Sequence, residues 1–186
     1  MTSTRKIADA LLVLDYRSGN KKALSALVKR WHPRLCRQAF WHTGDIDLAK
    51  DIAQESWKTI LFKLHTLKDP HCFGNWALTL VNRKALDWLR KNKNRKEQCS
   101  DLPDFTADTP EEVRAENDET SRRIKILKQA IKQLPAPQQM VLHLFYVEEY
   151  SLQEIGGILN IAPGTVKSRL FYAREKLKTL ITSKNP

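Results

Sequence analysis

Residues 151–177 read SLQEIGGILNIAPGTVKSRLFYAREKL, and this stretch carries the signals of two short helices joined by a tight turn. Ser151 and Glu154 have the spacing of a capping box, in which each side chain accepts a hydrogen bond from the other residue's backbone amide. Asn160 tolerates the left-handed conformation that ends many helices. Pro163 suits the first position of a helix, because its missing N–H would be unpaired there anyway. The pattern predicts a helix-turn-helix.

The second helix of this motif has two distinct faces. At about 100° per residue, its apolar side chains fall within one sector, which we predict to face the protein core. That sector contains Val166, Leu170, Ala173 and Leu177. Phe171 and Tyr172 lie on the opposite side, although the alternative that Phe171 packs against another helix of its domain stays open.

The same helix has the composition of a DNA-recognition helix. In such helices the N-terminal residues reach base edges in the major groove while cations contact phosphates. Lys167, Ser168 and Phe171 are therefore candidates for base contacts, and Phe171 suits a thymine methyl group. Arg169 and Arg174 are better placed for phosphates. The predicted set is Thr165, Lys167, Ser168, Arg169, Phe171, Tyr172 and Arg174.

Charge is distributed unevenly along the 186 residues. Lysine and arginine total 32 and aspartate and glutamate total 21, which gives a formal net charge of +11. Residues 83–98 and 163–186 each carry a net charge of +5, whereas residues 100–120 carry −7. Two basic runs separated by an acidic one favour two contacts to one polyanion. Nucleic acid is the first candidate and an anionic membrane surface is the second.

Hydrophobic periodicity predicts helices along most of the chain and strands nowhere. We expect Ile7, Leu11 and Leu14 to form the apolar face of a first helix. In the second helix we expect a kink or a break at Pro33. Further helices are predicted at about residues 46–64 and 73–93.

An acidic segment at residues 99–120 separates two helical parts. It contains two prolines and few large apolar side chains, so it cannot bury enough surface to offset its ordering entropy and is interpreted as a linker. We therefore predict an all-α protein of two small helical domains, residues 1–98 and 121–186, joined by this acidic linker.

The predicted helix at residues 73–93 combines aromatic and basic side chains. Trp76 and Trp88 lie on it near a basic end, and aromatic rings beside cations suit the binding of unstacked bases in single-stranded DNA. A core role is the alternative, and it fits Trp76 better because Trp76 is in phase with Phe73 and Leu80.

The start of the predicted helix at residues 46–64 is acidic. Acids at that position interact favourably with the helix dipole, which is one explanation for them. An acidic face on a basic protein also suits a protein partner. The polar residues in question are Asp45, Asp47, Asp51, Gln54 and Glu55.

Membrane and secreted proteins are disfavoured by the sequence. No secretory signal is recognised, and the longest uncharged stretch, residues 134–147, is too short and too polar to span a bilayer. The three cysteines Cys36, Cys72 and Cys99 are scattered and odd in number, which fits a reducing compartment. We expect a cytoplasmic protein without membrane insertion.

Catalytic and metal chemistry are also disfavoured. There is no glycine-rich phosphate loop and no nucleophile spaced to pair with a base, so we expect no enzyme and no cofactor. His32 and Cys36 are four residues apart, with His42 beyond them, but no CxxC or HExxH pattern exists. We therefore expect no metal site.

Four stretches follow one another in a recognisable order: DLAKDIAQESW (47–57), FGNWALTLVNRKALDWLRKNKNR (73–95), LPAPQQMVLHLFYVEEYSLQEIGGIL (134–159) and APGTVKSRLFYAREKL (162–177). Together they resemble bacterial RNA polymerase sigma factors, and among these the small two-domain extracytoplasmic-function (ECF) type. The resemblance covers nearly the whole chain outside the acidic linker and the first twenty or so residues.

The resemblance implies a division of roles. The first domain, similar to sigma region 2, would bind core RNA polymerase through Asp47, Asp51, Gln54 and Glu55. Its loop at residues 65–72 and the helix from Phe73 would recognise and melt the promoter −10 element. Residues implied there are Lys68, His71, Asn75, Trp76, Asn82, Arg83, Trp88, Arg90 and Lys91.

The second domain, similar to sigma region 4, would recognise the −35 element with the helix from Pro163. No catalysis is implied, because the polymerase does the chemistry. Core RNA polymerase, promoter DNA and an anti-sigma factor are the implied partners.

The sequence departs from the family pattern at four places. The usual Asp-Ala-Glu-Asp is LAKD at residues 48–51, and a frequent Arg-Asn pair of the melting helix is Asn82-Arg83. Tyr172 stands where an arginine is usual, so a hydrogen-bonding group replaces a charge. Gly156 stands where an alanine is usual; a glycine costs about 1 kcal/mol inside a helix, or else it marks the close approach of another helix.

A helix-turn-helix repressor or activator that binds duplex DNA by itself is the competing hypothesis. The feature that separates the two is the basic, tryptophan-containing helix from Phe73 to Arg95 preceded by an acidic one. A repressor does not need that pair.

Overall fold

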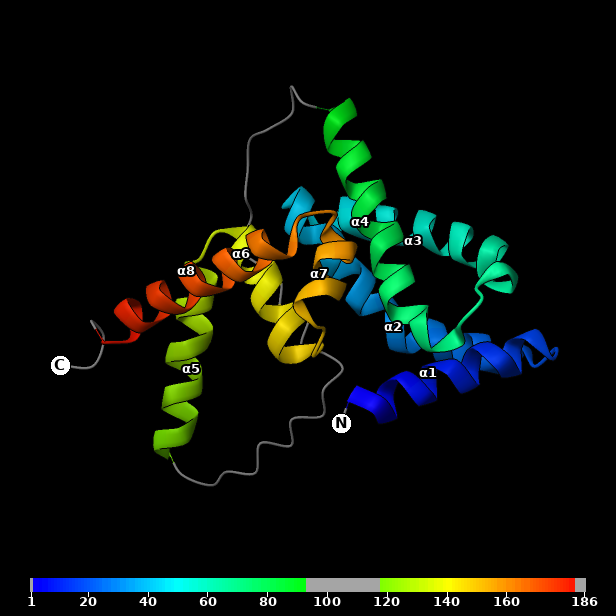
Figure 1. The fold of residues 1–186 in the computed structure, drawn as a ribbon, viewed down its shortest axis with the longest axis horizontal. Helices are drawn as coiled ribbons and strands as arrows, with labels where there is room; N and C mark the ends of the chain where they lie inside the picture. Colours follow the sequence, from blue (N-terminus) through cyan, green and yellow to red (C-terminus); the bar gives the residue numbers. More distant parts are fainter. Residues whose placement is uncertain (1, 93–117, 183–186) are drawn as a thin grey trace. The chain divides into compact units, whose positions relative to one another are not determined.

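The computed structural model describes residues 2–92 and 118–182, and every regular element in them is a helix, as predicted. They form two compact units (Figure 1). The first is built mainly from α1 (Thr2–Arg17), α2 (Lys21–Thr43), α3 (Ile46–Lys63), η1 (Leu64–Thr66), η2 (Pro70–Cys72) and α4 (Phe73–Lys91). The second is built mainly from α5 (Asp118–Lys132), α6 (Ala136–Leu142), η4 (His143–Val147), α7 (Leu152–Leu159) and α8 (Pro163–Thr182).

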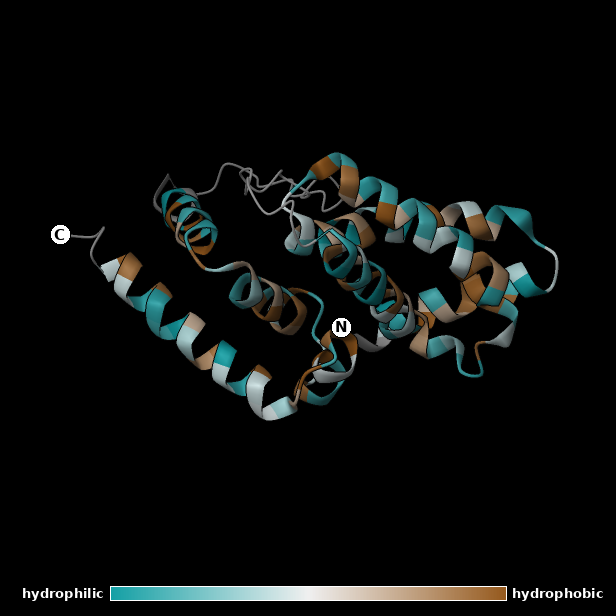
Figure 2. Ribbon diagram, turned by 90° about the horizontal axis from the view of Figure 1, so that it is seen from above, coloured by the Kyte–Doolittle hydropathy of each residue, from teal (hydrophilic) through white to brown (hydrophobic). Residues whose placement is uncertain are grey.

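The first unit is organised around α2, which packs against α1, α3 and α4. Leu27 and Leu35 are fully buried along its inner face. Trp31 meets Phe73, the first residue of α4, edge to face with ring centroids 5.5 Å apart. The chain is not broken at Pro33, since α2 continues as one helix through this residue. Figure 2 shows brown, apolar residues recurring along the helices between teal, hydrophilic ones.

The predicted apolar face of α1 is wrong. Ile7, Leu11 and Leu14 are 46 to 56 % exposed, whereas Ala10 and Val13 are buried. Small side chains allow α1 to lie close to α2, and the buried Asp9 pairs with the half-buried Arg30 at 2.8 Å, which holds the same face inward. The helix therefore presents its larger aliphatic side chains outward.

Asn82, which the sequence predicted to contact DNA, is buried and only 2 % exposed. Leu78, Asn82 and Ala85 lie one turn apart on α4 and all face inward. The Asn82 amide oxygen accepts a hydrogen bond from Gln38 at 3.4 Å and another from the His42 ring at 2.6 Å. Asn82 is a structural residue that links α2 to α4, and it is not available to DNA in this fold.

The second unit buries apolar side chains from all of its helices, with α8 packed against α5 and α6. Leu144 and Ile155 are nearly inaccessible to solvent. Gln139 is also buried, and its amide donates a hydrogen bond to the Leu134 carbonyl at 2.7 Å, which closes the turn between α5 and α6.

The predicted linker, residues 99–120, lies almost entirely outside the described residues. Its last three positions are an exception, since α5 begins at Asp118 and the helix therefore starts earlier than predicted. The predicted end of the first domain at residue 98 also lies outside them. Within the described residues, no helix combines the length and the apolar composition needed to cross a membrane.

The buried polar cluster predicts a pH dependence. Burial lowers the pKa of His42 below its usual value, against an opposing contribution from its hydrogen bond to Asn82. The unfolded chain therefore binds a proton at a pH where the folded chain does not, so stability is present above a pH of about 6.5 and is lost as the pH falls below it.

We expect the free energy of unfolding to fall between about pH 7.5 and about pH 5.5, and His42→Gln to remove much of that fall. All five tryptophans lie in residues 31–88, so tryptophan fluorescence during denaturant unfolding follows this unit. An identical pH dependence in wild type and His42→Gln would contradict the assignment.

Candidate nucleic-acid interface

The predicted helix-turn-helix is present in α7 and α8, with each expected local signal in place. The Ser151 hydroxyl accepts from the Glu154 amide at 3.2 Å, and the Glu154 carboxylate accepts from the Ser151 amide at 2.8 Å. Asn160 ends α7 in the left-handed region at φ 55° and ψ 48°, and Pro163 is the first residue of α8. These local interactions set the direction in which α8 leaves the turn.

Gly156 lies where the turn and the first residue of α8 come close to α7. The Gly156 carbonyl accepts from the Ile161 amide at 3.0 Å, which folds the turn back over α7. A Cβ atom at residue 156 would lie 2.9 Å from the Ile161 carbonyl oxygen and 3.5 Å from the Pro163 ring. Such a contact with backbone is too close for any side chain to be accommodated without displacement of the turn.

The faces of α8 agree with the helical-wheel prediction. Val166, Leu170 and Ala173 are buried, while Leu177 is half-buried. Phe171 and Tyr172 are 57 % and 62 % exposed, and their rings touch edge to face with centroids 5.5 Å apart. The alternative of a core position for Phe171 is therefore excluded within this unit.

The polar candidates on α8 are accessible as well. Thr165, Lys167, Ser168 and Arg174 are exposed and Arg169 is half-buried. The Ser168 hydroxyl donates to the Gly164 carbonyl at 3.0 Å, so its lone pairs remain available to a donor from outside.

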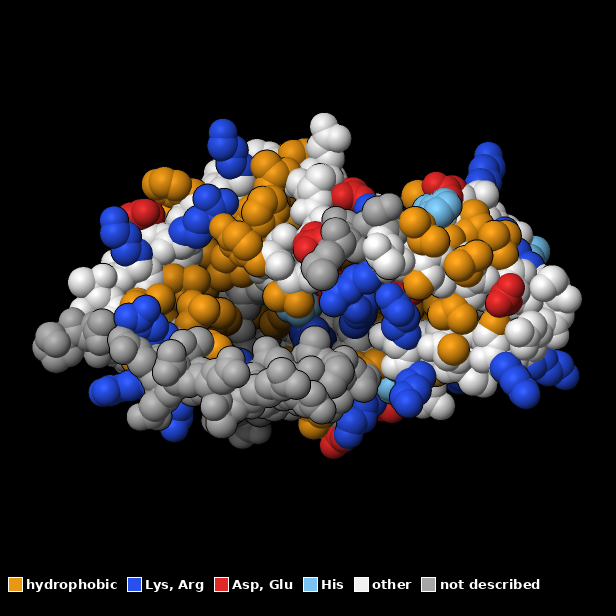
Figure 3. Space-filling view, turned by 90° about the horizontal axis from the view of Figure 1, so that it is seen from below, with side chains coloured by type: hydrophobic (Ala, Val, Ile, Leu, Met, Phe, Trp, Pro, Cys, Tyr) orange, Lys and Arg blue, Asp and Glu red, His pale blue; other side chains and the backbone are white. Residues whose placement is uncertain are grey.

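Tyr146 is a neighbour of this surface that sequence reasoning missed. It is 56 % exposed on η4, and the Arg174 guanidinium lies over its ring at 6.0 Å from the centroid. That distance is at the outer limit of a cation–π contact. The sequence offered no signal for it, since the contact joins two helices. Figure 3 shows hydrophobic side chains at the surface of the protein among lysines and arginines.

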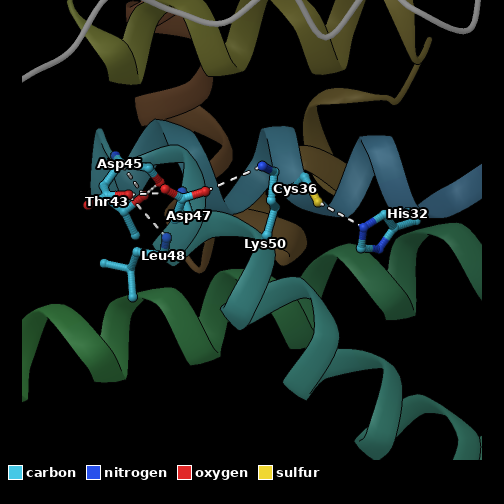
Figure 4. A network of polar contacts seen from close by, with 7 residues as sticks. All are labelled: His32, Cys36, Thr43, Asp45, Asp47, Leu48 and Lys50. Carbon is cyan, nitrogen blue, oxygen red and sulfur yellow. Dashed lines mark hydrogen bonds and ion pairs between the residues drawn. The ribbon is translucent and has the colours of Figure 1, made fainter.

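A second exposed surface runs along α3. Asp45 caps the helix by accepting from the amides of Asp47 and Leu48, so the helix-terminus explanation holds for this acid (Figure 4). Asp51 and Glu55 lie beyond the first turn, where the dipole contributes little.

The accessible residues of this surface include every position on α3 that is predicted to bind core RNA polymerase. Lys50 pairs with Asp47 at 3.4 Å, and Lys58 pairs with Glu55 and holds the pKa of Glu55 below its usual range by hydrogen bonding and charge. Phe62, which the sequence reading did not select, continues the same stripe seven residues after Glu55 and is 76 % exposed. We call this surface the α3 face: Asp47, Asp51, Gln54, Glu55, Lys58 and Phe62.

The remaining candidates lie on α4 and in the segment before it. Asn82 apart, all of them reach the surface at least partly. Trp76 is half-buried with its ring 6.2 Å from that of Phe73, so it combines a core contact with an accessible edge. Asn75 and Trp88 are also half-buried. The exposed ones are Lys68, His71, Arg83, Arg90 and Lys91.

His32 and Cys36 lie together in the structure, whereas His42 has a different partner. The Cys36 sulfur lies 3.5 Å from the His32 ring, whereas His42 bonds to Asn82 (Figure 4 shows the first pair). Burial raises the pKa of Cys36 to about 11, which keeps the thiol protonated. In the described part of the chain no three potential ligands from His, Cys, Asp and Glu come together.

Comparison with known families supplies the identity of this arrangement. Residues 27–95 match the family model for sigma-70 region 2, and residues 124–177 match the one for sigma-70 region 4. The chain belongs to the sigma-70 family. It is thus a sigma factor, which directs RNA polymerase to promoters at transcription initiation, and the competing hypothesis of a free-standing repressor is not favoured.

Individual relatives of this sigma factor are distant but cover most of its length. RNA polymerase sigma factor SigV of Bacillus subtilis is 28 % identical over 80 % of this chain and 85 % of its own. ECF RNA polymerase sigma factor SigW of the same organism is 27 % identical over 89 % of this chain and 92 % of its own. The fold resembles the sigma factor RpoE in complex with the anti-sigma factor NepR from Bartonella quintana, with a TM-score of 0.61 and 20 % identity over 87 % of this chain and 98 % of that one.

The turn of the helix-turn-helix predicts opposite effects for two adjacent glycines. Gly156→Ala places a methyl group against the Ile161 carbonyl, so we expect the second unit to lose about 1–2 kcal/mol of stability despite the better helix propensity of alanine. Gly157→Ala is the matched control: no atom lies within 4 Å of its Cβ position, and we expect a gain of up to about 1 kcal/mol.

The measurement is far-UV circular dichroism during unfolding, which reports helices in both units. A stabilised Gly156→Ala protein would show that the turn does not constrain this position.

Proposed function

We propose that the two units of this sigma factor contact separate promoter elements, and that the first unit also provides the attachment to core RNA polymerase. The proposal rests chiefly on α8, which is held by a capped, closely packed turn and turns accessible aromatic and cationic side chains away from its own core. In this role the protein is a polymerase subunit without chemistry of its own.

The second unit is proposed to read the −35 element with α8. Lys167, Ser168 and Phe171 lie on its accessible side in the first three turns, where recognition helices contact base edges. Arg169 and Arg174 are assigned to the phosphates. Tyr146 is proposed to help position Arg174 for this contact, because the guanidinium lies over its ring at 6.0 Å from the centroid.

The first unit is proposed to bind and open the −10 element with the segment before α4 and with α4 itself. Lys68, His71 and Arg83 offer exposed positive or hydrogen-bonding groups, and Trp76 and Trp88 offer half-exposed rings on which an unstacked base can lie. Asn82 is left out of this contact, and it acts by holding α4 against α2.

Core RNA polymerase is proposed to bind the α3 face. Its acids, Asp47, Asp51 and Glu55, suit a basic partner surface, and Phe62 adds an exposed aromatic group of the kind that often dominates binding energy at protein interfaces. An anti-sigma factor is a further proposed partner, because the solved relative named above is held in complex with one.

The test of the proposal is reconstitution with core RNA polymerase. We expect the purified protein to associate with core enzyme and to support transcription in vitro from promoters located by genome-wide mapping of start sites. Failure to associate with core enzyme, together with tight binding to a palindromic duplex, would favour the repressor instead.

Substitutions on α8 test the assignment of the −35 contact. We expect Lys167→Ala and Arg169→Ala each to weaken binding to a −35 duplex by about 1–3 kcal/mol, with binding to core enzyme unchanged. Electrophoretic mobility shift with the duplex and fluorescence anisotropy with core enzyme measure the two affinities. Equal loss of both affinities would indicate misfolding and remove the support for the assignment.

A further inference from the structure

Arg17, in the last turn of α1, is bonded to a segment far from it in the sequence. Its Nη2 group donates to the carbonyl oxygen of Leu64 at 2.6 Å and to that of Leu67 at 2.5 Å. One Nη2 group carries two hydrogens, so it can serve both acceptors at once. These acceptors are 47 and 50 residues away along the chain.

The two carbonyls are ones that the local helices leave poorly paired. Leu64 follows the end of α3, where the last carbonyls have no partner within the helix. The Leu64 oxygen also accepts a long bond of 3.4 Å from the Leu67 amide across η1. A guanidinium at this position satisfies both acceptors and also meets the negative end of the α3 dipole.

The bonded segment connects α3 to α4 and is held at both ends. Leu64 and Phe73 are buried at 1 % and 0 % exposure, whereas most of the side chains between them are exposed. Asp69 shapes the middle by accepting from the His71 amide at 2.9 Å and from the Cys72 thiol, and these bonds lower the pKa of Asp69. Figure 1 shows the segment beside α1, and η2 packs against that helix.

We propose that Arg17 is a positioning residue for opening of the −10 element: it holds residues 64–72 in the conformation that presents Lys68 and His71 to the separated DNA strand. The inference rests on the proposed function of the first unit. Arg17 does not have to touch DNA for this role, since its Nη2 group is directed at the protein backbone. Without the two bonds, the segment has to be ordered at the moment of binding, and affinity for the open strand falls.

The experiment compares Arg17→Met with the matched control Lys21→Met in the full chain. Both variants remove one positive charge from an exposed base and keep a long unbranched side chain, but only Arg17→Met removes the bonds to Leu64 and Leu67. Hydrogen exchange of the backbone amides in the free protein reports the order of residues 64–72. Promoter opening is followed in the reconstituted holoenzyme, on a promoter mapped as described above.

We expect Arg17→Met to accelerate exchange in residues 64–72 but not in α2, and to leave binding to core enzyme unchanged. Promoter opening should weaken about tenfold, which corresponds to about 1.4 kcal/mol. The logarithm of the holoenzyme's affinity for the promoter should fall with the logarithm of the salt concentration at the same slope as in wild type, because a positioning residue neutralises no phosphate. Lys21→Met should match wild type in exchange and in opening.

Two results would overturn the inference. A salt slope reduced by about one in Arg17→Met would make Arg17 a phosphate contact. Unaltered exchange or unaltered opening would make the two hydrogen bonds dispensable. A wild-type holoenzyme that opens no promoter would instead refute the proposed function, and the inference with it.

Discussion

Each helix of this protein has to bury one face, because helices of this length are only marginally stable in water by themselves. That constraint also determines which face remains for partners. On α8, burial of Val166, Leu170 and Ala173 leaves Phe171 and Tyr172 directed outward. On α3, burial of Ala49, Ile52, Ala53 and Ile60 leaves the α3 face accessible. Stability of the fold and presentation of the binding surfaces are therefore two consequences of the same packing.

The first unit adds buried polar contacts to this apolar packing. Gln38 and His42 on α2 meet Asn82 on α4, and Asp9 on α1 meets Arg30 on α2. A buried polar group costs free energy unless its partner lies in the right place, so these pairs favour one arrangement of the helices over others of similar apolar burial. The Arg17 contact extends the same principle to the segment before α4, where exposed side chains would otherwise leave the backbone free to vary.

Sequence reasoning succeeded where the signal is local and periodic. The capping box at Ser151, the left-handed Asn160 and the start of α8 at Pro163 all depend on residues within a few positions of one another. It failed on α1, where Ile7, Leu11 and Leu14 have the right period for a buried face. Periodicity shows that an apolar stripe exists but not what lies against it, and here the smaller Ala10 and Val13 allow the closer approach to α2.

The sequence by itself determined the all-α class, the helix-turn-helix and the two accessible charged surfaces, because capping, helical period and charge are properties of neighbouring residues. Only the tertiary structure decided that Asn82 is buried, that Arg17 bonds to Leu64 and Leu67, and that Tyr146 lies under Arg174. These three depend on side chains brought together from different helices. A polar or aromatic residue looks the same in the sequence whether a distant partner or solvent satisfies it, so only the packing of the helices distinguishes the two.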